Sequence, residues 1–303
     1  MRASGTLRIG TRSSRLALAQ AEIALRALAS TDAFRSAEIV PITTRGDAIS
    51  ARQPRGRWVA TDGQFTRELE RALLRGDVDV AVHSFKDLPT EPVEGLVIGA
   101  VLERADARDC LMTVSDHGLD GLPFGGRIGT SSPRRAAQLA ATRCDLIAVP
   151  LRGNVETRLH RLEAGEFDGL ILAAAGLDRL GIPVPASARL PFELMLPAPA
   201  QGALALQVRA DDGRLCSALA VVDHAPTRIA VEAERTLLRA IGGGCLAPLG
   251  ALGEVDRDTI RLRAAFEDGS GAFVRTEASG ATADPASVVA RVADEILALV
   301  AAS

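Results

Sequence analysis

The stretch Ala81–Thr90 reads AVHSFKDLPT and begins within a mainly apolar run, Val78–Val82, which reads VDVAV. It places four chemically versatile side chains within five residues at the end of this run: His83, Ser84, Lys86 and Asp87. A short buried strand that ends in polar residues is typical of an open α/β sheet, where ligands bind beyond the carboxyl ends of the strands. The stretch therefore predicts an α/β fold with a functional site at this strand end.

Lys86 is the only lysine among 35 basic residues. One interpretation is that a genome rich in arginine codons has kept a single lysine by drift. The other is that a compact ammonium near the hydroxyl of Ser84 and beside the carboxylate of Asp87 serves a site for anionic groups and developing positive charge. The residues alone leave both interpretations open.

Short apolar runs alternate with amphipathic helical patterns along most of the chain, which is typical of parallel α/β sheets. We expect strands at 7–9, 39–43, 78–82 and 96–101, and helices at about 13–29 and 66–75. The same alternation of strands and helices begins again further on, with expected strands at 127–129, 146–150 and 169–175, and helices from 132 and at 155–164. A strand at 203–208 follows a proline-rich linker. From residue 228 a helix, three strands (249–253, 260–266, 272–276) and a helix from 285 indicate a small α+β domain.

The composition excludes several classes of protein. A chain of 303 residues has room for two or three domains. A net charge of −3, 3% aromatic residues and no tyrosine argue against nucleic-acid binding. No apolar stretch approaches the roughly 18 residues of a membrane span, and the amino terminus has no targeting pattern, so we expect a cytoplasmic protein that does not bind membranes. The spacing of the four cysteines and four histidines predicts neither a metal site nor a disulfide.

A helix start is signalled by Ser131, Ser132 and Pro133, a serine cap followed by proline at the first helical position. Arg134 and Arg135 follow in the first turn, where the helix dipole disfavours cations by a few tenths of a kcal/mol (~0.3–1) each. An anion docked there would explain the pair, since free N–H groups and guanidiniums could bind it together. The alternative is two solvated surface arginines.

Similar basic junctions recur where other predicted strands lead into helices. Thr11–Arg15 combines cations with hydroxyls, Leu151–Asn154 precedes a helix that carries Arg158, and Arg179 follows a further apolar run. The four junctions together predict a site that holds several carboxylates or phosphates. Neither a Walker motif nor a GxGxxG pattern is present, so a nucleotide is not the favoured anion.

Cys245 follows three glycines, Gly242–Gly244, and precedes Leu246-Ala247-Pro248. This setting favours an exposed turn that carries a reactive or modified thiol. A buried and inert cysteine, the commonest kind, is the alternative.

Six motifs in order resemble those of the porphobilinogen deaminase family, also called hydroxymethylbilane synthases: AVHSFKDLPT, GTSSPRRAAQLA, LRGNVETRL, LILAAAGLDRLG, LPAPAQGALALQ and GGGCLAP. The resemblance covers nearly the whole chain. It implies two α/β domains of the periplasmic-binding-protein type, 1–102 with 200–220 and 106–197, and a small C-terminal α+β domain, 225–303. It also implies a dipyrromethane cofactor made from two substrate units and joined by a thioether to Cys245.

The resemblance implies a monomeric transferase of porphyrin and heme biosynthesis. Four molecules of porphobilinogen would condense head to tail with loss of ammonia, and water would release the linear tetrapyrrole. Asp87 would bond pyrrole N–H groups, stabilise the cation left by ammonia and assist proton transfer. The residues implied to bind cofactor and substrate are Arg12, Ser14, Ser84, Lys86, Thr130, Ser132, Arg134, Arg135, Arg152, Gly153, Arg158, Arg179 and Gln201.

The chain departs from the family pattern in the long loop Arg45–Gly63, which is typical of a lid or of simple disorder. The family has a Gly-Gly-Lys-Gly-like run before phenylalanine, whereas this chain reads ATDGQF at 60–65 and lacks the lysine. Arg15 stands where proline is common, and Leu246 where glutamine is common. These departures concern the lid and the rate rather than the type of reaction.

Two other functions fit parts of the pattern. A two-lobed receptor or sensor domain would bind anions without catalysis, but it would gain nothing from Asp87 among cations. An acyltransferase with Cys245 as nucleophile would need a histidine partner and a free thiol.

Overall fold

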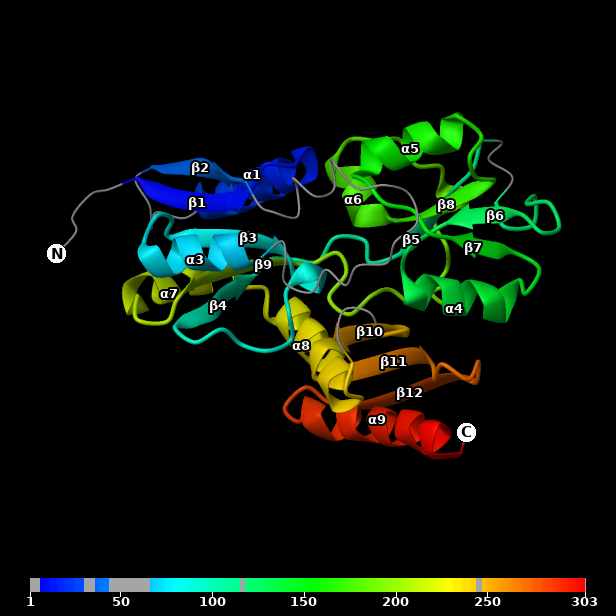
Figure 1. Cartoon of the computed structure of the whole chain (residues 1–303). Coiled ribbons are helices and arrows are strands. Elements are labelled where there is room, and N and C mark those ends of the chain that lie inside the picture. Colours follow the sequence, from blue (N-terminus) through cyan, green and yellow to red (C-terminus); the bar gives the residue numbers. More distant parts are fainter. Residues whose placement is uncertain (1–5, 30–35, 44–65, 115–117, 244–246, 303) are drawn as a thin grey trace. The chain divides into compact units, whose positions relative to one another are not determined.

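A computed structural model describes residues 6–29, 36–43, 66–114, 118–243 and 247–302 of the chain (Figure 1). The chain divides into two compact units. The first comprises residues 1–105 and 203–228, and the second comprises 106–202 and 229–303. Both units are therefore built from two separate stretches of sequence.

The first unit contains a five-stranded sheet in the order β2-β1-β3-β9-β4. Its strands are β1 (Leu7–Arg12), β2 (Ala37–Ile42), β3 (Val80–Ser84), β4 (Leu96–Val101) and β9 (Leu204–Arg209). β1 runs parallel to both β2 and β3, whereas β9 lies antiparallel between β3 and β4. The late strand β9 thus completes a sheet that the amino-terminal residues begin.

Helices α1 (Arg15–Ala29), α3 (Arg67–Arg75) and α7 (Gly213–Leu219) belong to this unit. Ala21, Ala24 and Leu28 of α1 pack with residues of β1, β3 and β9 in one apolar cluster. A second cluster joins α3 to Val78 and Ala81. Because apolar clusters include residues of both faces of β3, its first three residues, Val80–Val82, are all apolar rather than alternating.

The second unit contains a four-stranded sheet in the order β5-β8-β6-β7. Its strands are β5 (Asp109–Met112), β6 (Arg127–Gly129), β7 (Ile147–Val149) and β8 (Gly169–Ala173), and its helices are α4 (Pro133–Thr142), α5 (Val155–Glu163) and α6 (Ala174–Arg179). β6 is parallel to β7 and β8, and β5 is antiparallel to β8.

A three-stranded antiparallel sheet, β10 (Leu249–Asp256), β11 (Thr259–Glu267) and β12 (Phe273–Ala281), also belongs to the second unit. Helices α8 (Ala225–Ala240) and α9 (Pro285–Ala302) contribute to its apolar core. Figure 1 shows α9 running along this sheet. Gly253 of β10 allows the backbone of α8 to come close, because a Cβ there would lie 2.8 Å from the carbonyl oxygen of Ala230.

The expected fold class is confirmed, since two α/β sheets are followed by a small C-terminal α+β part. Strand β5 and helices α6 and α7 were not expected, and α8 begins earlier than the pattern indicated. The strand expected at 169–175 ends at Ala173, and α6 begins at the next residue. The three-domain division with its boundaries stays a prediction. Within the described residues, no helix is long and apolar enough to cross a membrane, and no group of three or more potential metal ligands is present.

Candidate functional site

The polar residues of the stretch Ala81–Thr90 lie at the carboxyl end of β3 and just beyond it. After the buried Val80–Val82 the chain enters a short 3-10 helix, Phe85–Asp87. Phe85 and Leu88 are buried, Lys86 is half-buried and Asp87 is exposed. The Phe85 N–H donates to the carbonyl oxygen of Ala203 over 3.0 Å, which joins this turn to the residue before β9. Two buried anchors therefore flank the exposed carboxylate, as expected for the carboxyl end of a buried strand.

Arg12 and Ser14 lie at the end of the neighbouring strand. β1 and β3 are adjacent and parallel, so their carboxyl ends meet at one edge of the sheet. Ser14 Oγ accepts a hydrogen bond from the Ala17 N–H at 3.3 Å, which begins α1 as a serine cap does. The topology thus brings Arg12 and Ser14 to the sheet edge that carries Ser84 and Asp87.

His83 is buried one residue before Ser84 and has no predicted catalytic role. Its Nε2 lies 3.1 Å from Oε1 of Gln207 on β9. Burial lowers the pKa of the imidazole to about 4, against the opposing effect of the Gln207 hydrogen bond, and Arg12 adds to the lowering. At neutral pH His83 is therefore an uncharged link between β3 and β9.

In the second unit, the expected helix start at Ser132 is confirmed. Ser132 Oγ accepts from the Arg135 N–H at 3.4 Å, and Pro133 is the first helical residue of α4. Thr130 Oγ1 accepts from the Ser132 N–H at 3.2 Å. The side chain of Ser131 donates to the carbonyl oxygen of Leu151 over 2.8 Å, which ties the turn after β6 to the segment after β7.

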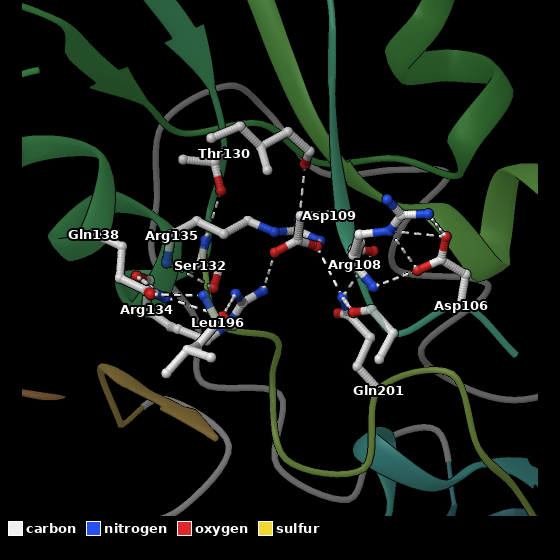
Figure 2. Close-up of polar contacts among 12 residues, drawn as sticks. Asp106, Arg108, Asp109, Thr130, Ser132, Arg134, Arg135, Gln138, Leu196 and Gln201 are labelled. Atoms are coloured by element: carbon white, nitrogen blue, oxygen red, sulfur yellow. Dashed lines mark hydrogen bonds and ion pairs between the residues drawn. The ribbon is translucent and has the colours of Figure 1, made fainter. Parts of the chain in front are cut away.

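Arg134 and Arg135 are buried, with 3% and 7% exposure, so the alternative of two solvated surface arginines is wrong. Arg134 Nη2 lies 2.8 Å from Asp109 Oδ2, and Arg135 Nη2 lies 2.7 Å from Asp109 Oδ1 (Figure 2). The anion beside the pair is thus a carboxylate of the same chain. Contact of these arginines with ligand carboxylates stays a prediction.

Asp109 was not among the predicted site residues, because nothing in its local sequence shows that it faces two arginines of α4. It is fully buried at the first position of β5. Burial alone would raise the pKa of its carboxyl, but the charges of Arg134 and Arg135 outweigh this effect and hold the pKa well below the ordinary range. Asp109 is therefore ionised at neutral pH.

Gln201 is buried and its amide points to the same carboxylate (Figure 2). Its Nε2 donates to Asp109 Oδ1 over 2.9 Å and to the carbonyl oxygen of Ala107 over 2.8 Å. The observed contacts make Gln201 a support of the buried Asp109 carboxylate. Its predicted contact with a ligand is not tested by them.

Three more predicted residues follow β7, at the same sheet edge as Ser132, because β6 and β7 are parallel neighbours. Arg152 is exposed, and Arg158 Nε donates to the carbonyl oxygen of Gly153 over 2.8 Å. Gly153 has φ 112°, and a Cβ there would lie 2.9 Å from Thr157 Cγ2, so this turn requires glycine. Asn154 caps α5 by accepting from the Thr157 N–H at 2.8 Å.

Arg179 is the last residue of α6, which follows β8. Its Nη2 donates to the carbonyl oxygen of Gly202 over 2.7 Å. Burial lowers the pKa of its guanidinium to about 10, so it remains charged at neutral pH.

Cys245 and the lid segment at 60–65 lie outside the described residues. Gly242 is described, and it ends the helical stretch with φ 67°, its N–H donating to the carbonyl oxygen of Arg239. At least one of the three glycines before Cys245 therefore ends α8.

Sequence comparison matches residues 7–217 to the model of the "porphobilinogen deaminase, dipyromethane cofactor binding domain". Residues 228–298 match the "porphobilinogen deaminase, C-terminal domain". The two matches cover nearly the whole chain and leave out the stretch around the start of α8.

Curated relatives agree with this assignment. The porphobilinogen deaminase of Xanthomonas oryzae pv. oryzae (strain KACC10331 / KXO85) is 45% identical over 289 residues, which are 95% of this chain and 94% of that protein. The porphobilinogen deaminase of Desulforudis audaxviator is 47% identical over 273 residues, 90% of this chain and 88% of that protein.

Solved structures show weaker likenesses. The methionine-binding protein MetQ has a TM-score of 0.43 at 13% identity, over 72% of this chain and 89% of that one. The periplasmic VFT2 domain of Bordetella pertussis BvgS has a TM-score of 0.41 at 12% identity, over 71% of this chain and 85% of that one. Likenesses this weak do not bear on function.

Proposed function

The chain belongs to the porphobilinogen deaminase family, and we propose that it condenses four porphobilinogen molecules head to tail into the linear tetrapyrrole hydroxymethylbilane. The observation that carries the proposal is the match to relatives of that name at 45% identity over 95% of the chain. The proposed enzyme is a transferase of porphyrin and heme biosynthesis. A monomeric state and a cytoplasmic location are proposed with it, from the sequence pattern alone.

The described residues fit the dipyrromethane cofactor that the family model names. Each pyrrole of this group bears an acetate and a propionate, so a site for it needs cations. Nε of Arg134, Arg135 and Arg179 is buried without a hydrogen-bond partner among the described residues. Buried donors of this kind are costly unless an acceptor reaches them. An anionic pyrrole chain supplies such acceptors, and we propose that it binds here and at Cys245.

When bound, the dipyrromethane supplies the nucleophilic pyrrole carbon to which the first substrate is added. The chain's own residues then have two tasks. They bind the carboxylates of cofactor and substrate, and they stabilise the positive charge and accept the proton that the reaction produces. For the first task we propose the basic residues at the two sheet edges, namely Arg12, Lys86, Arg134, Arg135, Arg152, Arg158 and Arg179. Ser14, Ser84, Thr130, Ser132, Gly153 and Gln201 complete the proposed binding set.

For the second task we propose Asp87 as the catalytic residue. At each step the bond between the substrate methylene and its amine breaks, ammonia leaves, and a carbon–carbon bond forms to the attacked ring. The ring carbon then loses a proton. An exposed carboxylate between the buried Phe85 and Leu88 is held in place to bond pyrrole N–H groups, offset the positive charge that develops and accept that proton.

Turnover of porphobilinogen by the purified chain tests the proposal. We expect one ammonia for each porphobilinogen consumed, and a released product that contains four pyrroles. The receptor alternative predicts saturable binding without release of ammonia. Binding without ammonia release by well-folded protein would therefore contradict the proposed function.

A further inference from the structure

We propose that Asp109 is a positioning residue that holds the guanidiniums of Arg134 and Arg135 in the orientation needed to bind carboxylates of the dipyrromethane. The inference rests on the proposed function and extends it to a residue outside the family motifs quoted above. It follows from the buried cluster of Asp109, Arg134, Arg135 and Gln201, here called the buried charge cluster (Figure 2).

Asp109 divides its carboxylate between the two arginines. Oδ2 lies 2.8 Å from Arg134 Nη2, and Oδ1 lies 2.7 Å from Arg135 Nη2. The second terminal nitrogen of each arginine is also engaged. Arg134 Nη1 donates to the carbonyl oxygen of Leu196 over 2.5 Å, and Arg135 Nη1 donates to that of Ile171 over 2.8 Å. Each guanidinium plane is thus fixed at two points, and its Nε is buried without a hydrogen-bond partner among the described residues.

Asp109 itself cannot follow the arginines if they move. Its backbone carbonyl accepts from the Leu190 N–H at 2.8 Å, and β5 pairs it with Ala173 of β8. Its Oδ1 also accepts from Gln201. The carboxylate is therefore a rigid reference point for side chains that carry several rotatable bonds.

The charges of the cluster do not balance. Among the described residues, Asp109 is the one carboxylate in contact with Arg134 or Arg135, so two buried cations face one anion. Burial and the neighbouring Arg135 charge together lower the pKa of Arg134 against the attraction of Asp109. A buried ionic group of this kind gives little net stability, and apolar residues of similar volume often serve a fold as well. An excess positive charge with buried, unpartnered Nε donors is instead suited to receive one more carboxylate.

Covalent uptake of porphobilinogen by cofactor-free full-length protein tests this inference. The fraction of protein that carries the adduct is measured by intact mass at increasing porphobilinogen concentration. For Asp109→Asn we expect the half-saturating concentration to rise about 10- to 100-fold, since misplacing a binding group by about an ångström can cost that much. The fraction loaded at saturation should stay close to the folded fraction, measured by circular dichroism.

Leu111→Ala is the matched control, because Leu111 is buried on the same strand two residues further and its side chain belongs to an apolar cluster. It lowers stability by creating a cavity. We expect it to reduce the loaded fraction in proportion to folding and to leave the half-saturating concentration unchanged. If Asp109→Asn behaves in the same way, Asp109 is only structural and the inference is wrong.

Asp109→Glu gives a second reading if Asp109→Asn fails to fold. It keeps the charge but lengthens the side chain by one methylene, so a positioning role again predicts a raised half-saturating concentration, and an unchanged value overturns the inference. The wild-type protein in the same assay distinguishes failure of the positioning role from failure of the proposed function. No adduct on the wild type contradicts the function, whereas a normal wild type with unaffected Asp109 variants contradicts only the positioning role.

Discussion

Gln20 and Ser84 join helix α1 to the end of β3, with Gln20 Nε2 donating to Ser84 Oγ over 3.1 Å. Gln20 is buried and Ser84 is half-buried, so the bond is partly sheltered from water. It fixes the hydroxyl that stands three residues before Asp87, while buried Phe85 and Leu88 fix the turn on either side. Asp87 therefore lies in a turn that two buried side chains and a hydrogen bond of the preceding strand hold in place.

Asp87→Ala should abolish almost all turnover of porphobilinogen without unfolding the protein, because Asp87 is exposed and its removal leaves no cavity. Asp87→Glu should keep a little activity, about 100-fold below wild type, since the longer side chain misplaces the carboxylate by about an ångström. Steady-state rates with circular dichroism on the same samples check both. Glu91→Ala, an exposed acidic control four residues on, should behave as wild type. Near-normal turnover in well-folded Asp87→Ala would remove Asp87 from the mechanism.

Arg158→Leu should lower kcat/KM for porphobilinogen by roughly 10- to 100-fold, because a hydrogen bond to a charged group is worth about 1.5–3 kcal/mol. Arg161→Leu is the matched control on the same helix. Arg161 pairs with Glu166 at 2.8 Å and stacks on Phe167, so its loss affects stability rather than ligand carboxylates. Equal effects of the two substitutions on kcat/KM, after correction for the folded fraction, would show that Arg158 does not serve the ligand.

His83 should remain neutral down to about pH 4, because its buried imidazole has a pKa lowered from 6.5 to about 4. A lowered folded-state pKa means that the unfolded chain binds the proton first. The stability that neutral His83 contributes is thus complete above pH 6.5 and declines as the pH falls from 6.5 towards 4.

At pH 5 the decline amounts to about 2 kcal/mol in the free energy of unfolding of the first unit. Proton NMR of the ring, assigned with His83→Gln, measures the titration directly, and urea unfolding at pH 8 and pH 5 measures the energy. A titration midpoint near 6.5 would show that the imidazole is not shielded as the structure describes.

Most of the strand ends and helix starts that carry the candidate site residues could be predicted from local sequence. The apolar run before Ser84 and the serine cap before Pro133 are short-range signals, and both elements form where these signals place them. Basic residues after strands β1, β6 and β7 could be recognised in the same way, because parallel strands bring their carboxyl ends together.

Long-range pairings could not be predicted from such signals. The place of β9 between β3 and β4 depends on a return of the chain from a distant segment, which only the family resemblance implied. Strand β5 is four residues long and carries Asp109 at its first position, with no periodicity to reveal it. The burial of Arg134 and Arg135 follows from that distant carboxylate, so their first-turn position alone left open whether they were solvated.

The covalent attachment of a dipyrromethane to Cys245 is the centre of the account, and peptide mapping of the purified protein tests it most directly. A thioether does not exchange with thiols, so the added mass should survive reduction. We expect the mass of two linked pyrrole units on the fragment that contains Cys245, and we expect Cys245→Ala to lack this mass and to be inactive. An adduct on Cys110, Cys144 or Cys216, or full activity of Cys245→Ala, would contradict it.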